Sequence, residues 1–269
     1  MEFAPPPARR FEVDIGPDQV ERYANDGFLV VERITSDEEL EWLRGVYDAL
    51  LAMPATGYLD GIFDLSRPYG STAQPQLGQL LLPERFVTRI HETSFWQNAR
   101  RISSRLLALP EPKLESWCHL IFKGANSPAE TPWHQDEAYW DVHKKFHALA
   151  TWLAIDDVDT NNGCLWYVPG SHRGDVKAHR HGGNDPAVHV LEFDEPADTS
   201  GAVPIPLEAG GMTFHTSRTF HFAGVNRTQR IRRAWGTAFQ SEPIPRDEPA
   251  PHQWWHDGKA AHAARQPKR

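Results

Sequence analysis

The segment TPWHQDEAYW, residues 131–140, holds an imidazole and a carboxylate two positions apart. In an extended strand, side chains alternate between the two faces, so His134 and Asp136 point the same way while Gln135 points opposite. Two histidines and one carboxylate on one side of an ion, with the opposite positions open, suit non-haem Fe(II) that must also bind dioxygen and a co-substrate. The segment therefore offers part of a metal site, and the missing member is a distant histidine.

An HxD pair is weak support by itself, because the pattern arises by chance and a buried His–Asp pair can be purely structural. The stretch FHTSRTFHFAGVNRTQRIRRA, residues 214–234, offers candidates for the remaining histidine. His215 ends an apolar run and is followed by a polar turn, whereas His221 begins the next strand. Both lie at strand ends, so the residues alone leave the choice between them open.

The same stretch leads into a final strand that carries a cluster of arginines, RIRRAWGTAFQ from Arg230. Alternation places Arg232 on one face with small residues, Gly236 among them, and these leave room for a ligand beside the guanidinium. A guanidinium can hold a carboxylate through two parallel hydrogen bonds, and a buried one needs such a partner. Arg232 is therefore the candidate, whereas Arg233 and the weaker competitor Arg230 are expected to be solvated.

The elements that must position these residues change character along the chain. The first half has helical periodicity and a capping box formed by Ser36 and Glu39, and a stretch rich in Gly and Pro follows. We expect helices over 17–26, after Ser36 and as a pair within 83–107, a strand over 28–32, and a long loop over 54–82.

From Leu114 onward the period changes to short strand-like runs separated by turns. So many short strands behind a helical N-terminal segment favour a jelly-roll or barrel core backed by helices. The expected strands lie near 115–123, 132–138, 148–156, 164–168, 188–193, 204–207, 212–215, 219–225 and 231–240.

Composition limits the other possibilities. The chain of 269 residues is 40% hydrophobic, which predicts one domain over 1–269 with tails at 1–15 and 243–269. A formal net charge of -8 argues against a nucleic-acid partner. No apolar run approaches the roughly 20 residues of a membrane span and no secretory signal is evident, so we expect a cytoplasmic protein without a membrane partner. The two cysteines, Cys118 and Cys164, predict neither a disulfide framework nor a thiolate metal site.

Three further motifs follow the HxD pair in order: DTNNGCLWYVPGSHRGD (159–175), GGMTFH (210–215) and HFAGVNRTQRIRRA (221–234). With them the sequence resembles the phytanoyl-CoA dioxygenase family of Fe(II)- and 2-oxoglutarate-dependent oxygenases, from the early DGFLVV segment to the last strand near Gln240. The resemblance implies a mainly β fold with helices (α+β), in which a double-stranded β-helix of the jelly-roll, cupin-like kind is backed by N-terminal helices.

The resemblance also decides between the histidines. In the family, the second metal histidine opens a segment like H-x-x-G-x-N-x-S/T, and His221 begins such a segment here. The implied metal ligands, which are also the catalytic residues, are His134, Asp136 and His221. His215 matches a family histidine that is not a ligand, and it is expected to be a neighbour of the site.

The 2-oxoglutarate arginine of the family falls eleven positions after the ligand histidine, which is Arg232 here. Trp152 stands where the family places an aromatic residue that lines the co-substrate pocket, and a core tryptophan is the alternative role. Ala223 stands where some members carry a serine that helps to bind the co-substrate. The residue that would bind the co-substrate together with Arg232 is therefore unassigned.

The implied chemistry uses Fe(II), 2-oxoglutarate and O2 to oxidise an unactivated C–H bond of a small-molecule substrate, with release of succinate. Hydroxylation is the usual outcome, and the retained carboxylate of Asp136 argues against halogenation. Epimerisation, cyclisation, desaturation and a non-catalytic jelly-roll metal-binding protein are the alternatives. His143 or His172 could approach the substrate, and Tyr139 and Trp140 could cover it. We expect a monomer or a homodimer.

Overall fold

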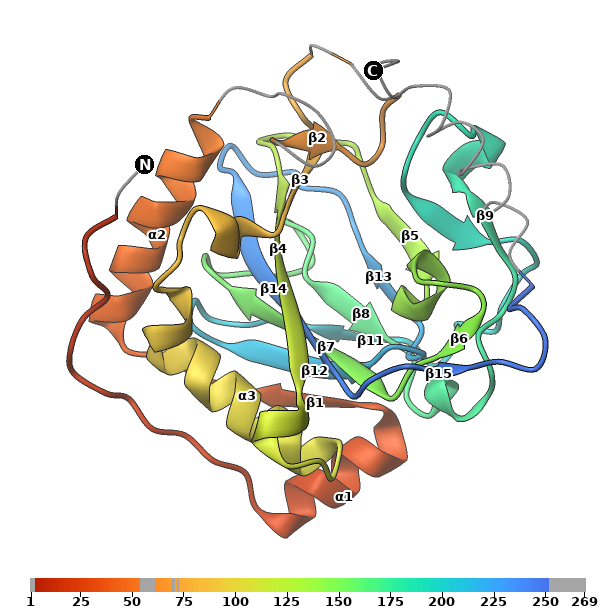
Figure 1. Cartoon of the computed structure of the whole chain (residues 1–269). Helices are drawn as coiled ribbons and strands as arrows, with labels where there is room; N and C mark the ends of the chain where they lie inside the picture. Colours follow the sequence, from red (N-terminus) through yellow and green to blue (C-terminus); the bar gives the residue numbers. More distant parts are fainter. Residues whose placement is uncertain (1–2, 54–60, 69–70, 72, 252–269) are drawn as a thin grey trace, which may run out of the picture.

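A computed structural model describes residues 3–53, 61–68, 71 and 73–251 of the chain. Antiparallel strands form most of its regular structure, and two facing sheets make up its centre (Figure 1). The α-helices of the described residues are α1 (Pro17–Asp26), α2 (Asp37–Leu51) and α3 (Ser94–Leu106). The prediction of a mainly β protein with helices is confirmed at this level.

The larger sheet has seven strands, and its central strand β14 pairs with β7 on one side and β4 on the other. The long pairing of β14 with β4 runs from Arg232 opposite Lys123 to Gln240 opposite Glu115. In sheet order, the strands are β1 (Phe28–Val31), β12 (Met212–Thr216), β7 (Ala148–Ala154), β14 (Arg232–Gln240), β4 (Glu115–Lys123), β3 (Leu77–Leu81) and β2 (Phe63–Asp64).

The smaller sheet has four strands and faces the larger one. Along the second half of the chain, the strands of the two sheets alternate except at β8 and β11: β4, β7, β12 and β14 lie in the larger sheet, and β5, β8, β11 and β13 lie in the smaller one. In sheet order, the smaller sheet is β11 (Val203–Ile205), β8 (Leu165–Tyr167), β13 (His221–Ala223) and β5 (Thr131–His134), and the short pairs are β9 (His179–His181) with β10 (Leu191–Phe193) and β6 (Lys144–Lys145) with β15 (Ile244–Pro245).

Helices α2 and α3 cover the outer face of the larger sheet (Figure 1). Tyr47 of α2 is fully buried and its hydroxyl donates to the carbonyls of Ile121 and Ala234, which lie on β4 and β14. Phe95 of α3 packs edge-on against Trp235 of β14. These contacts bury the outer face of the sheet, so its inner face is left to form a cavity.

The capping box expected at Ser36 is only half made. The Ser36 hydroxyl accepts from the backbone N–H of Glu39, as predicted. The Glu39 carboxylate does not turn back to its own helix but accepts from the backbone N–H groups of Ser94 and Phe95, at 2.7 and 2.9 Å. A buried carboxylate at the N-terminus of α3 satisfies free N–H groups and the helix dipole together, and so it ties the two helices to each other.

Three other expectations differ from the structure. The segment 54–82 is more than a loop, because its described part contains β2 and β3, which extend the larger sheet beside β4. The segment 83–107 contains one α-helix preceded by two 3-10 turns, Pro83–Arg85 and Ile90–Glu92, and not a pair of α-helices. Strands β6, β9 and β15 lie where no strand was expected.

The expected tails are partly packed. Asn98 of α3 donates to the carbonyl of Phe11 and accepts from the N–H of Val13, so the N-terminal segment crosses α3 in an extended form. Near the other end, β15 pairs with β6. The rest of the expected C-terminal tail, residues 252–269, lies outside the described residues.

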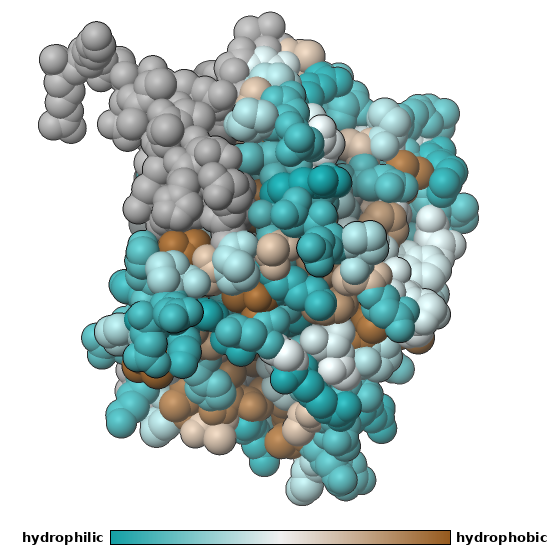
Figure 2. Space-filling model, turned by 90° about the vertical axis from the view of Figure 1, so that its right-hand side faces the viewer, coloured by the Kyte–Doolittle hydropathy of each residue, from teal (hydrophilic) through white to brown (hydrophobic). Residues whose placement is uncertain are grey.

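The face that lies to the right in Figure 1 is mostly hydrophilic, with apolar residues in small groups (Figure 2). Within the described part of the chain, no helix has the length and apolar character that crossing a membrane requires.

Candidate active site

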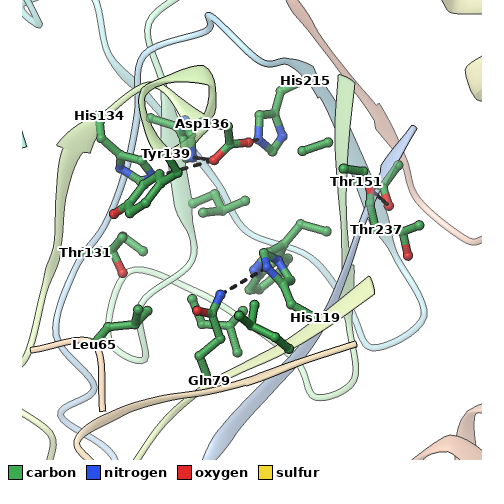
Figure 3. Close-up of a pocket in the computed structure, with 18 of the residues that line it drawn as sticks. Leu65, Gln79, His119, Thr131, His134, Asp136, Tyr139, Thr151, His215 and Thr237 are labelled. Carbon is green, nitrogen blue, oxygen red and sulfur yellow. Dashed lines mark hydrogen bonds and ion pairs between the residues drawn. The ribbon is translucent and has the colours of Figure 1, made fainter. Parts of the chain in front are cut away.

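A cavity of about 340 Å³ lies between the two sheets, and the residues predicted to hold the metal and the co-substrate line it (Figure 3). Side chains of β5, β8 and β13 of the smaller sheet line one side, and side chains of β3, β4, β7, β12 and β14 of the larger sheet line the other. The residues that line it are Leu65, Gln79, Leu81, Leu82, Trp117, His119, Ile121, Thr131, His134, Asp136, Tyr139, Trp140, Ala150, Thr151, Trp152, Leu165, His189, His215, His221, Ala223, Arg232, Thr237 and Ala238.

His134 and Asp136 both face the cavity, although the strand is shorter than the predicted 132–138. Strand β5 ends at His134, and Asp136–Tyr139 forms a 3-10 turn. Gln135 between them is still extended, with φ -122° and ψ 135°, so alternation carries through to Asp136. The Gln135 side chain points away, where its amide donates to the carbonyl of Arg218 and accepts from the N–H of Lys177.

The turn after Asp136 is held by the buried carboxylate of Glu137. Glu137 forms ion pairs with Arg218 at 2.7 Å and with Arg246 at 3.1 Å. Its backbone N–H donates to the carbonyl of Ser217, the residue that follows β12, at 3.0 Å. Glu137 therefore fixes the backbone behind Asp136, while the aromatic residues that follow it, Tyr139 and Trp140, line the cavity.

His221 lies directly opposite His134 across the pairing of β13 with β5. The Nε2 atoms of His134 and His221 lie 3.7 and 3.4 Å from Oδ1 of Asp136. One ligand atom from each of these residues lies within 4.8 Å of the other two, so a single ion could touch all three. The structure thus brings His134, Asp136 and His221 together, whereas His215 approaches the other oxygen of Asp136.

Backbone carbonyls orient both imidazoles. Nδ1 of His134 lies 2.7 Å from the carbonyl of Pro132, and Nδ1 of His221 lies 2.9 Å from the carbonyl of Thr219. A carbonyl only accepts, so each Nδ1 carries the proton and each Nε2 presents its lone pair to the cavity. This arrangement is common for metal-binding histidines, whose second nitrogen is usually held by a hydrogen bond.

Asp136 is held from behind by a buried chain of hydrogen bonds. Nε2 of His215 donates to Oδ2 of Asp136 at 3.1 Å, and the Tyr167 hydroxyl donates to Nδ1 of His215 at 2.9 Å. The hydroxyl of Thr213 lies 2.8 Å from that of Tyr167. Burial favours the neutral acid, but His221 and His215 outweigh it and hold the pKa of Asp136 well below its ordinary value. The carboxylate is therefore ionised, with Oδ1 left for an ion.

Arg232 begins β14 and is 2% exposed, and its guanidinium points into the cavity. Among the described residues, nothing accepts a hydrogen bond from its Nε or Nη1. Its Cζ lies 5.2 Å from the ring centre of Trp152, a cation–π contact. Burial lowers the pKa of Arg232 to about 10, so the group stays charged at neutral pH. A buried charge without a partner is costly, and this corner therefore suits an anionic ligand.

Unlike Arg232, the basic residues Lys123 and Arg233 beside it have hydrogen-bond or ion-pair partners within the protein. The amino group of Lys123, which is fully buried opposite Arg232, donates to the carbonyls of Ala129 and Ala223 at 2.7 and 3.2 Å. Arg233 is not solvated as expected, because it pairs with Asp156 at 2.7 Å and also with Asp48. Arg230 is exposed, in line with the expectation.

Sequence reasoning missed several lining residues. His119 and His189 face the cavity, whereas His143 and His172 do not line it. His172 instead contacts the carbonyl of Ala24. Alternation along β4 could have indicated His119, because β4 pairs with the strand that carries Arg232. No pattern marked Gln79, which lies in the segment expected to be a loop.

Comparison with known proteins fits this site. A model of the phytanoyl-CoA dioxygenase (PhyH) family matches residues 23–234. Peroxisomal phytanoyl-CoA dioxygenase of Rattus norvegicus is 28% identical over 239 residues, which span 81% of this chain and 66% of the rat protein. Phytanoyl-CoA dioxygenase domain-containing protein 1 of Bos taurus is 23% identical over 258 residues, or 82% of this chain and 88% of that protein.

Solved structures share the fold. EvdO2 from Micromonospora carbonacea var. aurantiaca, crystallised with 2-oxoglutarate, has a TM-score of 0.79 and 34% identity and covers 90% of this chain and 98% of its own. The epimerase SnoN, in complex with Fe3+, alpha ketoglutarate and nogalamycin RO, has a TM-score of 0.66 and 22% identity, with 85% of each chain covered. The site and fold define the class of Fe(II)- and 2-oxoglutarate-dependent oxygenases. Within it, the chain belongs to the phytanoyl-CoA dioxygenase family.

Proposed function

We propose that this protein is an Fe(II)- and 2-oxoglutarate-dependent dioxygenase that hydroxylates an unactivated C–H bond of a small-molecule metabolite and converts 2-oxoglutarate to succinate. The observation that carries the proposal is that one cavity contains both a possible metal site and a possible anion site. Ligand atoms of His134, Asp136 and His221 lie within 4.8 Å of one another, and the buried, unpartnered guanidinium of Arg232 lines the same space.

The donor set fits Fe(II). Nε2 of His134, Nε2 of His221 and Oδ1 of Asp136 would hold the ion, because their other ring nitrogens and the other carboxylate oxygen are already occupied by hydrogen bonds. Two imidazoles and one carboxylate are the ligands of the facial triad of non-haem Fe(II) oxygenases. When bound, the iron would activate dioxygen with electrons from 2-oxoglutarate, and the protein would orient the iron and the 2-oxoglutarate.

Arg232 fits one carboxylate of 2-oxoglutarate through paired hydrogen bonds, and the ring of Trp152 forms the wall beside it. Thr131 is the cross-strand partner of Ala223 and lines the same cavity. Its hydroxyl lies on the strand beside Ala223, the position at which some family members carry a serine hydroxyl. Thr131 is thus the candidate for the second anchor that the sequence left unassigned.

The remaining cavity favours a small substrate. Trp117, Tyr139 and Trp140 line it, and Arg232, which the co-substrate engages, is the one Lys or Arg among its described lining residues. The phosphates of an acyl-CoA would need further cations. Large aromatic faces and few charges suit a neutral ring-bearing metabolite, which would stack on them.

The alternation of successive strands between the two sheets supports a double-stranded β-helix of the jelly-roll kind. His134 and His221 come from strands of the smaller sheet, Asp136 from the turn that directly follows β5, and Arg232 from the larger sheet. That arrangement leaves the space between the sheets for the substrate.

The test is conversion of 2-oxoglutarate to succinate by purified protein with Fe(II), first alone and then with a library of metabolites. The proposal expects slow succinate release alone, faster release with a substrate, and a product heavier by one oxygen. A product without that mass gain would replace hydroxylation by epimerisation, cyclisation or desaturation. No succinate under any condition would contradict the proposed enzyme.

A further inference from the structure

The C-terminal segment, residues 244–250, runs beside the residues that follow the Asp136 turn. Its strand β15 pairs with β6, and the backbone N–H of Arg246 donates to the carbonyl of His143 at 2.8 Å (Figure 1). The segment lies beyond the residues that the family model matches, which end at 234. Its contacts with the active site are therefore a feature of this chain outside the matched region.

The side chain of Arg246 is buried and fully engaged by protein oxygens. It is 6% exposed, and its Nη2 donates to Oε1 of Glu137 at 3.1 Å. Nη1 and Nη2 donate to the two carboxylate oxygens of Asp175 at 3.2 and 2.9 Å. Nε donates to the carbonyl of Lys144 at 3.0 Å. Each nitrogen of the guanidinium thus has an acceptor, and the group is held in one place.

Arg218 completes a closed network around the Glu137 carboxylate. Its Nε and Nη2 donate to Oε2 and Oε1 of Glu137 at 2.7 and 2.9 Å, and its Nη2 lies 3.4 Å from Oδ1 of Asp175. The two positive and two negative charges balance, which allows Glu137 to be ionised with a side chain that is 2% exposed. We call Glu137, Asp175, Arg218 and Arg246 the Glu137 network.

This network determines where the backbone of Asp136 lies. Both chain neighbours of Asp136 are attached to Arg218, because Glu137 binds its guanidinium and the amide of Gln135 donates to its carbonyl at 2.8 Å. His215 donates to the Asp136 carboxylate, but that bond sets the rotation of the side chain. The position of the turn itself depends on the Glu137 network.

Resting on the proposed function, we propose that Arg246 is a positioning residue for the metal site. It holds the Glu137 carboxylate and, through it, the turn that places Asp136 against the two histidine ligands. The C-terminal segment thereby completes a site whose ligands all lie in the core. Metal affinity should therefore depend on a side chain that touches none of the ligand atoms.

The test is titration of the metal-free protein with Co(II), a divalent ion that takes the same nitrogen and oxygen ligands as Fe(II) and whose visible spectrum reports their geometry. Arg246→Met keeps an unbranched stem and removes the donors, so the Kd for Co(II) should rise about tenfold and the spectrum should change. Arg246→Lys keeps the charge and should recover part of the affinity. An unchanged Kd in a folded Arg246→Met protein would overturn the proposal.

Arg233→Met is the matched control for the loss of an arginine with two carboxylate partners. The Arg233 side chain is 13% exposed, pairs with Asp156 at 2.7 Å and with Asp48, and does not line the cavity. Thermal denaturation should show a lower Tm for both variants, whereas the Kd for Co(II) should rise only in Arg246→Met. Equal increases of the Kd would mean that lost stability weakens the site, and would overturn the proposal.

A double-mutant cycle tests whether Arg246 acts through Glu137. In a Glu137→Gln background the carboxylate that Arg246 holds is gone, so Arg246→Met should raise the Kd less than it does in wild type. Additive effects would show a different route and contradict the proposal.

Asp175→Asn keeps the proposal testable if the variants at buried positions fail to fold. The Asp175 side chain is 62% exposed, so its replacement leaves the core unchanged, and looser alignment of Arg246 should raise the Kd about threefold. An unchanged Kd would overturn the proposal. Wild-type protein that fails to bind Co(II) would overturn the proposed function as well, whereas normal wild-type binding with unaffected variants would overturn this inference alone.

Discussion

The two ends of the cavity contrast in how their polar groups are satisfied. At the metal corner, each group that could hold an ion is braced by the protein: His134 and His221 by backbone carbonyls, and Asp136 by His215. At the other end, the guanidinium of Arg232 is buried against Trp152 with no acceptor for Nε and Nη1 among the described residues. Braced ligands indicate a preformed site for an ion, and an unpartnered charge indicates where an anion must come from outside.

The largest effect is expected at the metal corner. His221→Ala removes a ligand atom, so it should abolish both Fe(II) binding and succinate formation. His215→Ala leaves the three ligand atoms in place and should still bind the ion. Equilibrium dialysis with Fe(II) and a succinate assay measure the two quantities, and the reverse pattern would mean that the two histidines have been confused.

The next effect belongs to the anion corner. Arg232→Met should weaken 2-oxoglutarate binding about 100-fold, from the roughly 3 kcal/mol that a hydrogen bond between charged groups contributes. Fe(II) affinity should stay as in wild type, because Arg232 does not touch the ligand atoms. Anaerobic titration gives both values, and an unchanged 2-oxoglutarate affinity would place the anion elsewhere.

A smaller effect should come from the chain of hydrogen bonds behind Asp136. His215→Phe leaves Oδ2 of Asp136 without its donor, so the carboxylate can turn and metal affinity should fall about 10- to 100-fold. His215→Gln can restore a donor and should recover part of the loss. Equal Fe(II) affinities for wild type and His215→Phe would show that Asp136 is oriented by other contacts.

The smallest effect concerns stability and two buried basic side chains that lie opposite each other, Lys123 and Arg232. Lys123→Met strands the carbonyls of Ala129 and Ala223, so the free energy of unfolding should fall by about 1–3 kcal/mol. Arg232→Met removes a buried charge that lacks a partner, so without 2-oxoglutarate it should not destabilise the protein. Urea denaturation of both variants without ligand measures this difference, and equal losses would mean that Arg232 is satisfied within the protein.

Features that depend on neighbouring residues along the chain could be predicted from the sequence, whereas features that depend on distant contacts could not. Alternation around His134 needs only local extended backbone, which persists through Gln135 although the strand ends. The strands β1, β4, β7, β12 and β14 of the larger sheet were located because each is a short run bounded by turns, whereas β2 and β3 fell in the segment expected to be a loop. The 3-10 turn after His134 was missed because it depends on Glu137 meeting Arg218 and Arg246, which are distant in sequence.

The place of Gln79 in the cavity was beyond local reasoning for a similar reason. Gln79 lies in a segment rich in turn-forming residues, and it becomes a strand only because β4 is beside it. Gly236, which was expected to leave room for a ligand, leaves room for the ring of His119, because the register of β14 with β4 places the two residues opposite each other. Tertiary pairing determines both features, whereas composition and periodicity report only on neighbours along the chain.

The central claim is that one cavity binds both Fe(II) and 2-oxoglutarate. Its most direct test is an anaerobic titration of the wild-type protein with Fe(II) followed by 2-oxoglutarate, recorded by visible absorption. The account predicts a weak charge-transfer band that appears only when both are present and saturates with 2-oxoglutarate. A protein that binds Fe(II) but develops no band at high 2-oxoglutarate would contradict it.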